Sequence, residues 1–353
     1  LYMAEGRRVV RSEFGNQKPE SVLDIFCAAT SKSRISRAEI AKMTGLSVVT
    51  VGKVVDALLS LKILRQTTSL DPAPGRKSRV LSAAGGLNIV VFNLATPSYT
   101  VHICDLMQHT VDTYTYHYNA DYFPDENLHF FFEQGAKYAS EKIQIQKCCG
   151  CAILTPGDYD DYTDRILFSR NPRLSGLAIS SIFEKYSFGT MPPLIRDIRR
   201  FTLDAALTTL HKGGSALCVF LEQPQITSCY LRRGDSTQDA RFCHFGNLNV
   251  GNGRTVEDFV CRSKNVDAAL DALTRTLYWI FSAVHVDKIV LTGSLYTDAG
   301  ALALLIGERL TELLQEENAR LPEVLGMKYI SAGVNSAAVA VKKNWFLTNV
   351  LQE

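Results

Sequence analysis

Residues 35–64 read ISRAEIAKMTGLSVVTVGKVVDALLSLKIL and predict two short helices joined by a tight turn. Ser36 is typical of a helix N-cap, and Glu39 three residues later completes a capping box for a helix that ends near residue 43. Gly45 suits the turn because glycine adopts positive φ without steric cost. Ser47 then caps a second helix that runs to about residue 60.

Apolar residues recur at helical spacing along this segment and predict a buried inner face. They are Ile40, Leu46, Val51, Val54 or Val55, and Leu58. The outward face at the start of the second helix holds Val48, Val49, Thr50, Gly52 and Lys53. In a helix-turn-helix these early positions reach base edges in the major groove, so the segment predicts DNA binding.

The following residues predict a β-hairpin wing, with strands at 63–65 and 75–83 around a polar loop. Cations at the start of the returning strand suit phosphates or a narrow minor groove. A small helical bundle with a hairpin and no DNA-binding role stays open as the alternative. The predicted DNA-binding residues are Ser36, Arg37, Ser47, Val48, Val49, Thr50, Lys53, Arg76, Lys77 and Arg79.

The charge of the 353-residue chain is unevenly distributed. Residues 1–82 hold 14 Lys and Arg against 7 Asp and Glu, a net charge of +7, whereas the whole chain carries only +2. The remaining residues therefore carry a net charge of −5. A basic head on a mildly acidic body is typical of a DNA-binding unit joined to a sensing or assembly unit.

Nine cysteines, an odd number, predict reduced thiols in a cytoplasmic protein. Three of them cluster in the CCGC sequence at residues 148–151, where the apolar surroundings predict a buried strand. Zinc needs about four ligands, and no histidine or second cysteine pair is near, so a metal site there is the weaker alternative. No apolar run reaches about 18 residues, so we expect no membrane span, no metal and no cofactor.

Residues 87–353 predict an α/β body in two halves, each with strands followed by helices. We expect a DNA-binding domain at 1–82, a first lobe at about 87–200 completed by a C-terminal helix at 332–353, and a second lobe at about 201–331. The predicted strands lie at 88–95, 99–106, 109–118, 149–154, 193–197, 216–221, 225–232, 288–294 and 326–330, and the main helices at 124–142, 267–282, 299–317 and 332–345.

Five sequence motifs resemble the ROK family, which groups repressors with sugar kinases. They are the GLS turn with its GRK wing, ILTPGDYD, NPRLSG, LIRDIRRFTLDAAL and KIVLTGS, and they span nearly the whole chain. The resemblance implies a winged helix-turn-helix followed by a bilobal, actin-like (ribonuclease H-like) body.

The chain departs from the kinases of that family where phosphates are bound. Their first Asp-x-Gly-Gly-Thr turn corresponds to residues 93–97, Asn-Leu-Ala-Thr-Pro, and Pro97 has no N–H to donate. Glu222 occupies a second Gly-rich turn, and a third keeps only Thr-Gly-Ser at 292–294. His244 and Asn247 replace the sugar-binding Glu and zinc-binding His. The resemblance therefore implies a body without catalysis.

Asp197 is the one catalytic position that the chain retains. It is either a general base that deprotonates a sugar hydroxyl or a helix N-cap, and the missing phosphate turns favour the N-cap. We expect a regulator, most simply a repressor, that binds double-stranded DNA as a homodimer or a dimer of dimers; an ATP-dependent sugar kinase is the alternative. A small, sugar-like effector is expected in a cleft lined by Asn171, Arg196, Asp197, His244 and Asn247.

Overall fold

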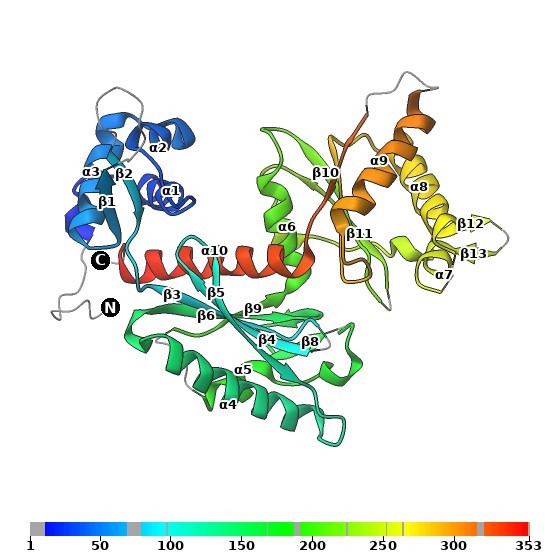
Figure 1. Cartoon of the computed structure of the whole chain (residues 1–353), viewed down its shortest axis with the longest axis horizontal. Coiled ribbons are helices and arrows are strands. Elements are labelled where there is room, and N and C mark those ends of the chain that lie inside the picture. The colour runs from blue at the N-terminus through cyan, green and yellow to red at the C-terminus, as the bar shows by residue number, and fades with distance from the viewer. Residues whose placement is uncertain are drawn as a thin grey trace.

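The computed structural model describes residues 11–68, 79–96, 98–167, 169–186, 191–223, 225–251, 253–262, 265–315 and 321–351. The chain forms a helical head and two larger α/β units, each built on its own sheet (Figure 1). A long C-terminal helix runs from the second sheet, along the first sheet, to the head (Figure 1).

The head contains three helices and a hairpin, and both predicted N-caps are confirmed. The Ser36 hydroxyl accepts from the Glu39 N–H, and the Ser36 N–H donates to the Glu39 carboxylate, which completes a capping box. Ser47 accepts from the Thr50 N–H. Gly45 closes the first of these helices at φ 71°. The elements are α1 (Pro19–Ala29), α2 (Arg37–Thr44), α3 (Val48–Ser60), β1 (Leu64–Thr68) and β2 (Arg79–Ala83), preceded by the 3-10 turn Arg11–Phe14.

Most of the predicted inner face of α2 and α3 is buried, and Leu46 is half-buried against it. Ile40, Val51, Val54, Val55 and Leu58 have no exposed surface, so both candidate valines belong to the core of the head. The axes of α2 and α3 are bent by 118° relative to each other. The hairpin is antiparallel, and Ile35 extends it by exchanging two backbone hydrogen bonds with Leu81.

The first sheet has the strand order β5-β4-β3-β6-β9, antiparallel on one side of β3 and parallel on the other. Successive β3 side chains alternate between two cores, as the pleat requires. Val90 and Phe92 pack toward α4, whereas Ile89 and Val91 pack toward the C-terminal helix. The strands are β3 (Asn88–Asn93), β4 (Ser98–Asp105), β5 (Thr110–His117), β6 (Cys148–Thr155) and β9 (Leu194–Asp197), with α4 (Pro124–Lys142) and α5 (Ile179–Glu184) below them.

The second sheet repeats the pattern with four strands in the order β11-β10-β14-β15, where only β11 is antiparallel. Helices α8 and α9 cover one face, and α6 contributes to the core on the other. Helices α6 and α10 pack against each other between the sheets (Figure 1). The elements are α6 (Ile198–Thr208), β10 (Ser215–Phe220), β11 (Thr227–Arg232), α7 (Val256–Val260), α8 (Val266–Ala283), β14 (Lys288–Thr292), α9 (Ala299–Gln315), β15 (Glu323–Gly326) and α10 (Tyr329–Asn349).

Three local predictions need correction. The strand expected at 326–330 lies at Glu323–Gly326, because Val324 and Leu325 pair with β14. Helix α10 therefore starts at Tyr329, three residues before the expected 332. Two small hairpins were not expected, β7 (Asp158–Asp160) with β8 (Arg165–Leu167) and β12 (Asn249–Gly251) with β13 (Arg254–Thr255).

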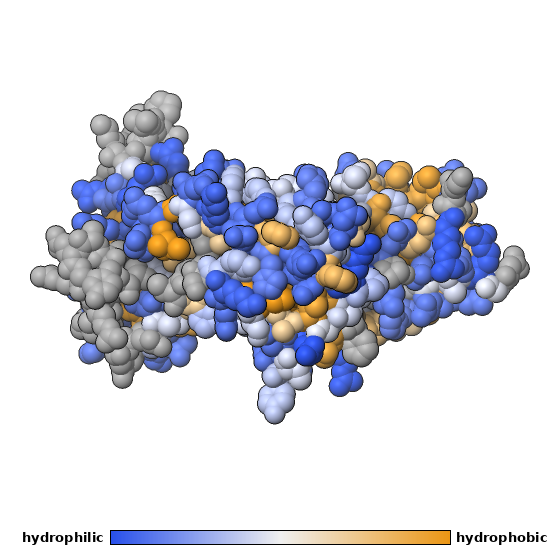
Figure 2. All heavy atoms as spheres, turned by 90° about the horizontal axis from the view of Figure 1, so that it is seen from below, coloured by the Kyte–Doolittle hydropathy of each residue, from blue (hydrophilic) through white to orange (hydrophobic). Residues whose placement is uncertain are grey.

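The CCGC sequence lies in β6, where all three cysteines are buried, as predicted. Within the described residues no group of three or more His, Cys, Asp or Glu could hold a metal ion. No single described helix has the length and apolar character to cross a membrane; α2 and α3 reach that threshold only as a sharply bent pair. Seen from below, the molecular surface is mostly hydrophilic with separate apolar areas (Figure 2).

Candidate functional site

The head presents an outward face at the start of α3. Val48 and Val49 are 59% and 70% exposed, and Lys53 one turn later is also exposed. Ser47 and Thr50 are linked side chain to side chain at 2.9 Å, so both hydroxyls take part in the cap. This face offers two methyl-rich side chains, a cation and a helix N-terminus, groups that can meet thymine methyls and phosphates.

Arg37 is less available than its sequence position suggested. Its Nη2 lies 2.6 Å from Asp56 Oδ1, and its side chain is about one-third exposed. Gly52 lies beside this pair, and a Cβ placed there would lie 3.7 Å from Arg37 Nη1, an ordinary van der Waals contact. The Arg37–Asp56 pair therefore does not require a glycine at this position of α3, where glycine lowers helix stability by about 1 kcal/mol relative to alanine.

Of the three predicted wing cations, Arg79 is described and exposed at the first residue of β2. It pairs with Thr68 at the end of the hairpin from which the connecting loop leaves. Arg76 and Lys77 lie outside the described residues.

A pocket of about 460 Å³ lies between the two large sheets, a volume within the usual range for a small-molecule site. Its walls come from the segments that follow parallel strands β3, β6, β10 and β14. Ligands of open α/β sheets bind at these carboxyl ends. The lining residues are Leu94, Ala95, Thr96, Tyr118, Pro156, Arg170, Asn171, Pro172, Arg173, Glu222, Gln223, Ser294 and Leu295.

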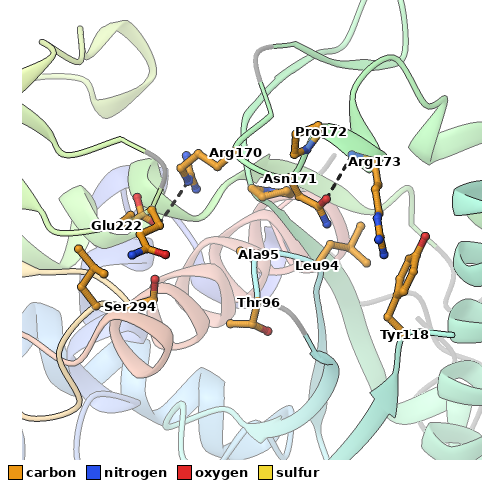
Figure 3. A pocket seen from close by; sticks show the side chains of 13 residues that line it. Leu94, Ala95, Thr96, Tyr118, Arg170, Asn171, Pro172, Arg173, Glu222 and Ser294 are labelled. Atoms are coloured by element: carbon orange, nitrogen blue, oxygen red, sulfur yellow. Dashed lines mark hydrogen bonds and ion pairs between the residues drawn. The ribbon is translucent and has the colours of Figure 1, made fainter. Parts of the chain in front are cut away.

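Polar side chains line opposite sides of this pocket (Figure 3). On one side the Arg173 guanidinium lies 4.7 Å from the centre of the Tyr118 ring, a cation–π contact. Asn171 holds the local backbone by accepting from the Arg173 N–H at 3.2 Å. On the other side Arg170 points toward Glu222 (Figure 3), with 3.3 Å between Nε and Oε1.

The turn after β3 is closed by its own hydrogen bonds. Asn93 is fully buried, and its Oδ1 accepts from the Ala95 N–H at 3.0 Å, while its amide nitrogen donates to Thr100. The Leu94 N–H donates to the Leu154 carbonyl at 2.9 Å. These two backbone donors are therefore already used and cannot cradle a phosphate.

The glycine in the turn after β14 has a packing role. Gly293 adopts φ 127°, and a Cβ there would lie 2.2 Å from the Leu221 carbonyl oxygen. The Leu295 N–H donates to that same carbonyl at 3.0 Å. A glycine is needed here because two backbone segments meet, whether or not a nucleotide binds.

Beside the pocket, four charged side chains form a buried cluster. Arg170 donates to both carboxylate oxygens of Asp197 at 3.2 Å, and Arg199 adds contacts at 3.0 and 2.6 Å. Arg170 also reaches Glu222 and donates to the Tyr329 hydroxyl at 3.3 Å. The cluster joins the first sheet, the second sheet and the start of α10, with two cations matching two carboxylates.

Burial and pairing shift the pKa values of the two carboxyls in opposite directions. Burial alone would raise the pKa of Asp197, but the charges of Arg170 and Arg199 outweigh it and hold the pKa well below its ordinary value. Burial raises the pKa of Glu222, only partly offset by Arg170, and its Oε2 has no partner among the described residues. Asp197 is thus held as a charged carboxylate. Its oxygens accept hydrogen bonds from the Arg170 guanidinium, the Arg199 guanidinium and the Arg199 N–H.

Asp197 also caps α6, because its Oδ1 accepts from the Arg199 N–H at 2.8 Å. The predicted N-cap is confirmed. The carboxylate is fully buried and does not line the pocket.

The predicted cleft needs revision, since only Asn171 among its five residues lines the pocket. Arg196 instead pairs with Asp204 at 3.4 Å. His244 and Asn247 are exposed on a 3-10 turn near β11. Tyr118, Arg170 and Arg173 line the pocket but were not predicted to do so. The two arginines flank the Asn-Pro pair of NPRLSG, so that motif already marked their position.

Solved structures similar to this chain include ROK family proteins, whereas no protein-family model and no curated protein matches the chain. A ROK family transcriptional regulator, a homologue of the Escherichia coli MLC protein, is 12% identical with a TM-score of 0.61 over 94% of this chain and 99% of that one.

A ROK family protein from Streptococcus pneumoniae TIGR4 in complex with sucrose is 13% identical, with a TM-score of 0.51 over 74% of this chain and 98% of that one. A ROK family glucokinase from Streptomyces griseus in complex with glucose and AMPPNP is 12% identical, with a TM-score of 0.50 over 72% and 98%. The chain therefore has the fold shared by a ROK regulator and ROK sugar-binding proteins.

Proposed function

We propose that this chain is a DNA-binding transcriptional regulator of the ROK type, with a winged helix-turn-helix head and a body that carries out no catalysis. The head carries this proposal. Helices α2 and α3 are capped and bent as a helix-turn-helix requires, and the start of α3 is exposed rather than packed on the body.

The coverage of the neighbours supports the same choice. The regulator matches 94% of this chain, whereas the sucrose complex and the glucokinase match 74% and 72%. A protein that matches the body but has no counterpart of the head would cover about this smaller share of the chain. If the chain were only a sugar kinase, its head would have no role.

The pocket favours binding over phosphoryl transfer. Two donors of the first phosphate turn are used internally, Glu222 brings a carboxylate to the second, and Asp197 is bound by two arginines. A general base must reach the proton that it abstracts, and this carboxylate does not face the pocket. We propose that the pocket holds a small effector, and hydroxyl-rich sugars suit its mixed polar lining.

Selection of bound duplexes from a random pool tests the DNA-binding role, followed by affinity measurements at several salt concentrations. We expect a two-half-site sequence, bound by a homodimer, with log affinity falling by about 0.9 per phosphate contact for each unit of log salt. Arg76→Ala should weaken binding to every sequence, whereas Val49 variants should change sequence preference. Failure to enrich any sequence would refute the regulator.

Transfer of phosphate from ATP to any member of a sugar panel would establish the kinase alternative, provided that Asp197→Asn abolishes it. A thermal-shift screen with the same sugars tests the effector pocket separately. A ligand at about 100 times its dissociation constant stabilises the folded chain by about 2.7 kcal/mol.

A further inference from the structure

A buried lysine joins the head to the body. Lys342 lies within α10 and is only 2% exposed. Its Nζ lies 2.9 Å from Thr30 Oγ1, 3.4 Å from the Thr30 carbonyl and 3.0 Å from the Leu106 carbonyl. Thr30 ends α1 of the head, and Leu106 follows β4 of the first sheet, so one ammonium connects three elements.

The chemistry of this contact matches an ammonium, which has three donors and no acceptor. The Thr30 hydroxyl gives its proton to the Phe26 carbonyl at 2.8 Å, so its oxygen accepts from Lys342. The carbonyls at the C-terminal end of α1 also favour a cation. All three partner oxygens therefore act as acceptors toward the Lys342 ammonium.

The ionisable groups around Lys342 are Cys27 on α1, Lys343 on α10, Asp105 on β4 and Cys149 on β6. Burial lowers the pKa of Lys342 to about 8, so the side chain is still protonated at neutral pH. A charge buried in this way is tolerated when its hydrogen bonds are satisfied, as they are here.

Aromatic rings join α1 to α10 beside Lys342, whose Nζ lies 5.9 Å from the centre of the Phe26 ring. Phe26 of α1 stacks on Phe346 of α10 with centroids 3.9 Å apart, and Trp345 lies 6.3 Å from Phe26. Apolar burial is not directional, whereas hydrogen bonds depend steeply on angle. The rings hold the head against the body, and the ammonium bonds restrict how it is turned.

We infer that Lys342 is a positioning residue that fixes the orientation of the head on the body and thereby the direction in which α3 faces DNA. The positioning stands on the contacts alone, and its consequence for DNA rests on the proposed function.

Trp345 provides a built-in reporter of this joint. The chain has two tryptophans, and Trp345 is buried at the joint while Trp279 is exposed on α8. In a Trp279→Phe background, emission and acrylamide quenching report on Trp345 alone. Lys342→Met keeps the length of the side chain and removes its donors. Lys343→Met is the matched control, one residue on and exposed.

We expect Lys342→Met to shift Trp345 emission to longer wavelength and to speed amide exchange in α1 about tenfold, leaving α8 unchanged. Affinity for the selected DNA should fall about tenfold. Thr30→Val, which removes one acceptor from the opposite side, should act in the same direction and serves if the first variant folds poorly. The control should resemble the parent chain.

Emission and α1 exchange equal to those of the control would overturn the inference. So would equal acceleration in α1 and α8, since that pattern reports general destabilisation. If Lys342→Met loosens the head but leaves DNA affinity unchanged, the inferred contribution of Lys342 to DNA binding is refuted. If the parent chain binds no DNA, the proposed function fails. Trp345 emission and amide exchange in α1 still show whether Lys342 positions the head on the body.

Discussion

The outer face of the head and the charged cluster beside the pocket differ in how far their side chains are exposed and paired with one another. Beside the pocket, Asp197 and Glu222 are buried, and both pair with Arg170. On the head, Val48, Val49 and Lys53 are exposed, and among the described residues no partner of Lys53 is seen. Side chains that satisfy each other stabilise structure, whereas side chains left to solvent are available to a partner. The difference supports the head, rather than the pocket, as the site of the proposed DNA contact.

The largest expected effect comes from removing Arg170, the central cation of the buried cluster, and it tests whether the paired charges stabilise the fold. Arg170→Met leaves Asp197 and Glu222 with one arginine between them, and we expect a loss of about 3–5 kcal/mol in the free energy of unfolding. Denaturant unfolding measures it. Arg173→Met, at the exposed edge of the same pocket, is the control and should change stability little. Equal losses in both would mean that the cluster is not special.

The charge of Asp197 gives a pH-dependent test. Its pKa is lowered in the folded chain, so its stabilising contribution is present above the ordinary carboxyl pKa and is lost as pH falls below it. Asp197→Asn keeps an N-cap residue and should cost about 2 kcal/mol or more at pH 7. The difference from the parent chain should narrow between about pH 4 and pH 2. A constant difference would contradict the charge account.

A cap substitution tests the head with a smaller effect. Ser47→Ala removes the acceptor for the Thr50 N–H and should cost about 1 kcal/mol of head stability. Ser60→Ala, at the other end of α3 and also exposed, is the matched control. Amide exchange along α3 distinguishes the two. Equal exchange in both variants would show that the cap does not hold this helix.

The smallest effect concerns base preference. Val49→Ala removes two methyl groups from the exposed face of α3 and should reduce discrimination for thymine at one operator position by about 1 kcal/mol. Competition between duplexes that differ only in that base measures it. Leu59→Ala on the same helix, a half-buried side chain, controls for indirect effects on stability. Unchanged discrimination would assign specificity to other residues.

Local sequence signals predicted the head well because its caps and turn lie within a few residues of each other. Helix α4 was also predicted with its observed bounds, starting at its proline. The cluster could not be predicted in this way. Arg170 contacts Tyr329 across 159 residues of sequence, and only the packing of both sheets against α10 brings them together.

The misplaced cleft residues have a similar cause. The family resemblance located His244 and Asn247 by motif order, but the chain there forms a short exposed turn rather than a pocket wall. Glu222 was recognised as a carboxylate unfavourable to phosphate, and its pairing with Arg170 depends on a contact between two sheets. Sequence order located these segments without showing which way their side chains point.

The joint at Lys342 has a consequence for synthesis. Thr30 and Lys342 are separated by 312 residues, so a ribosome completes the head long before it makes the helix on which the head is seated. Helices α1, α2 and α3 contact one another, and their buried core is continuous with that of α10. If Lys342 positions the head as we infer, we expect the nascent head to acquire a fixed direction only when α10 has been made as far as this lysine.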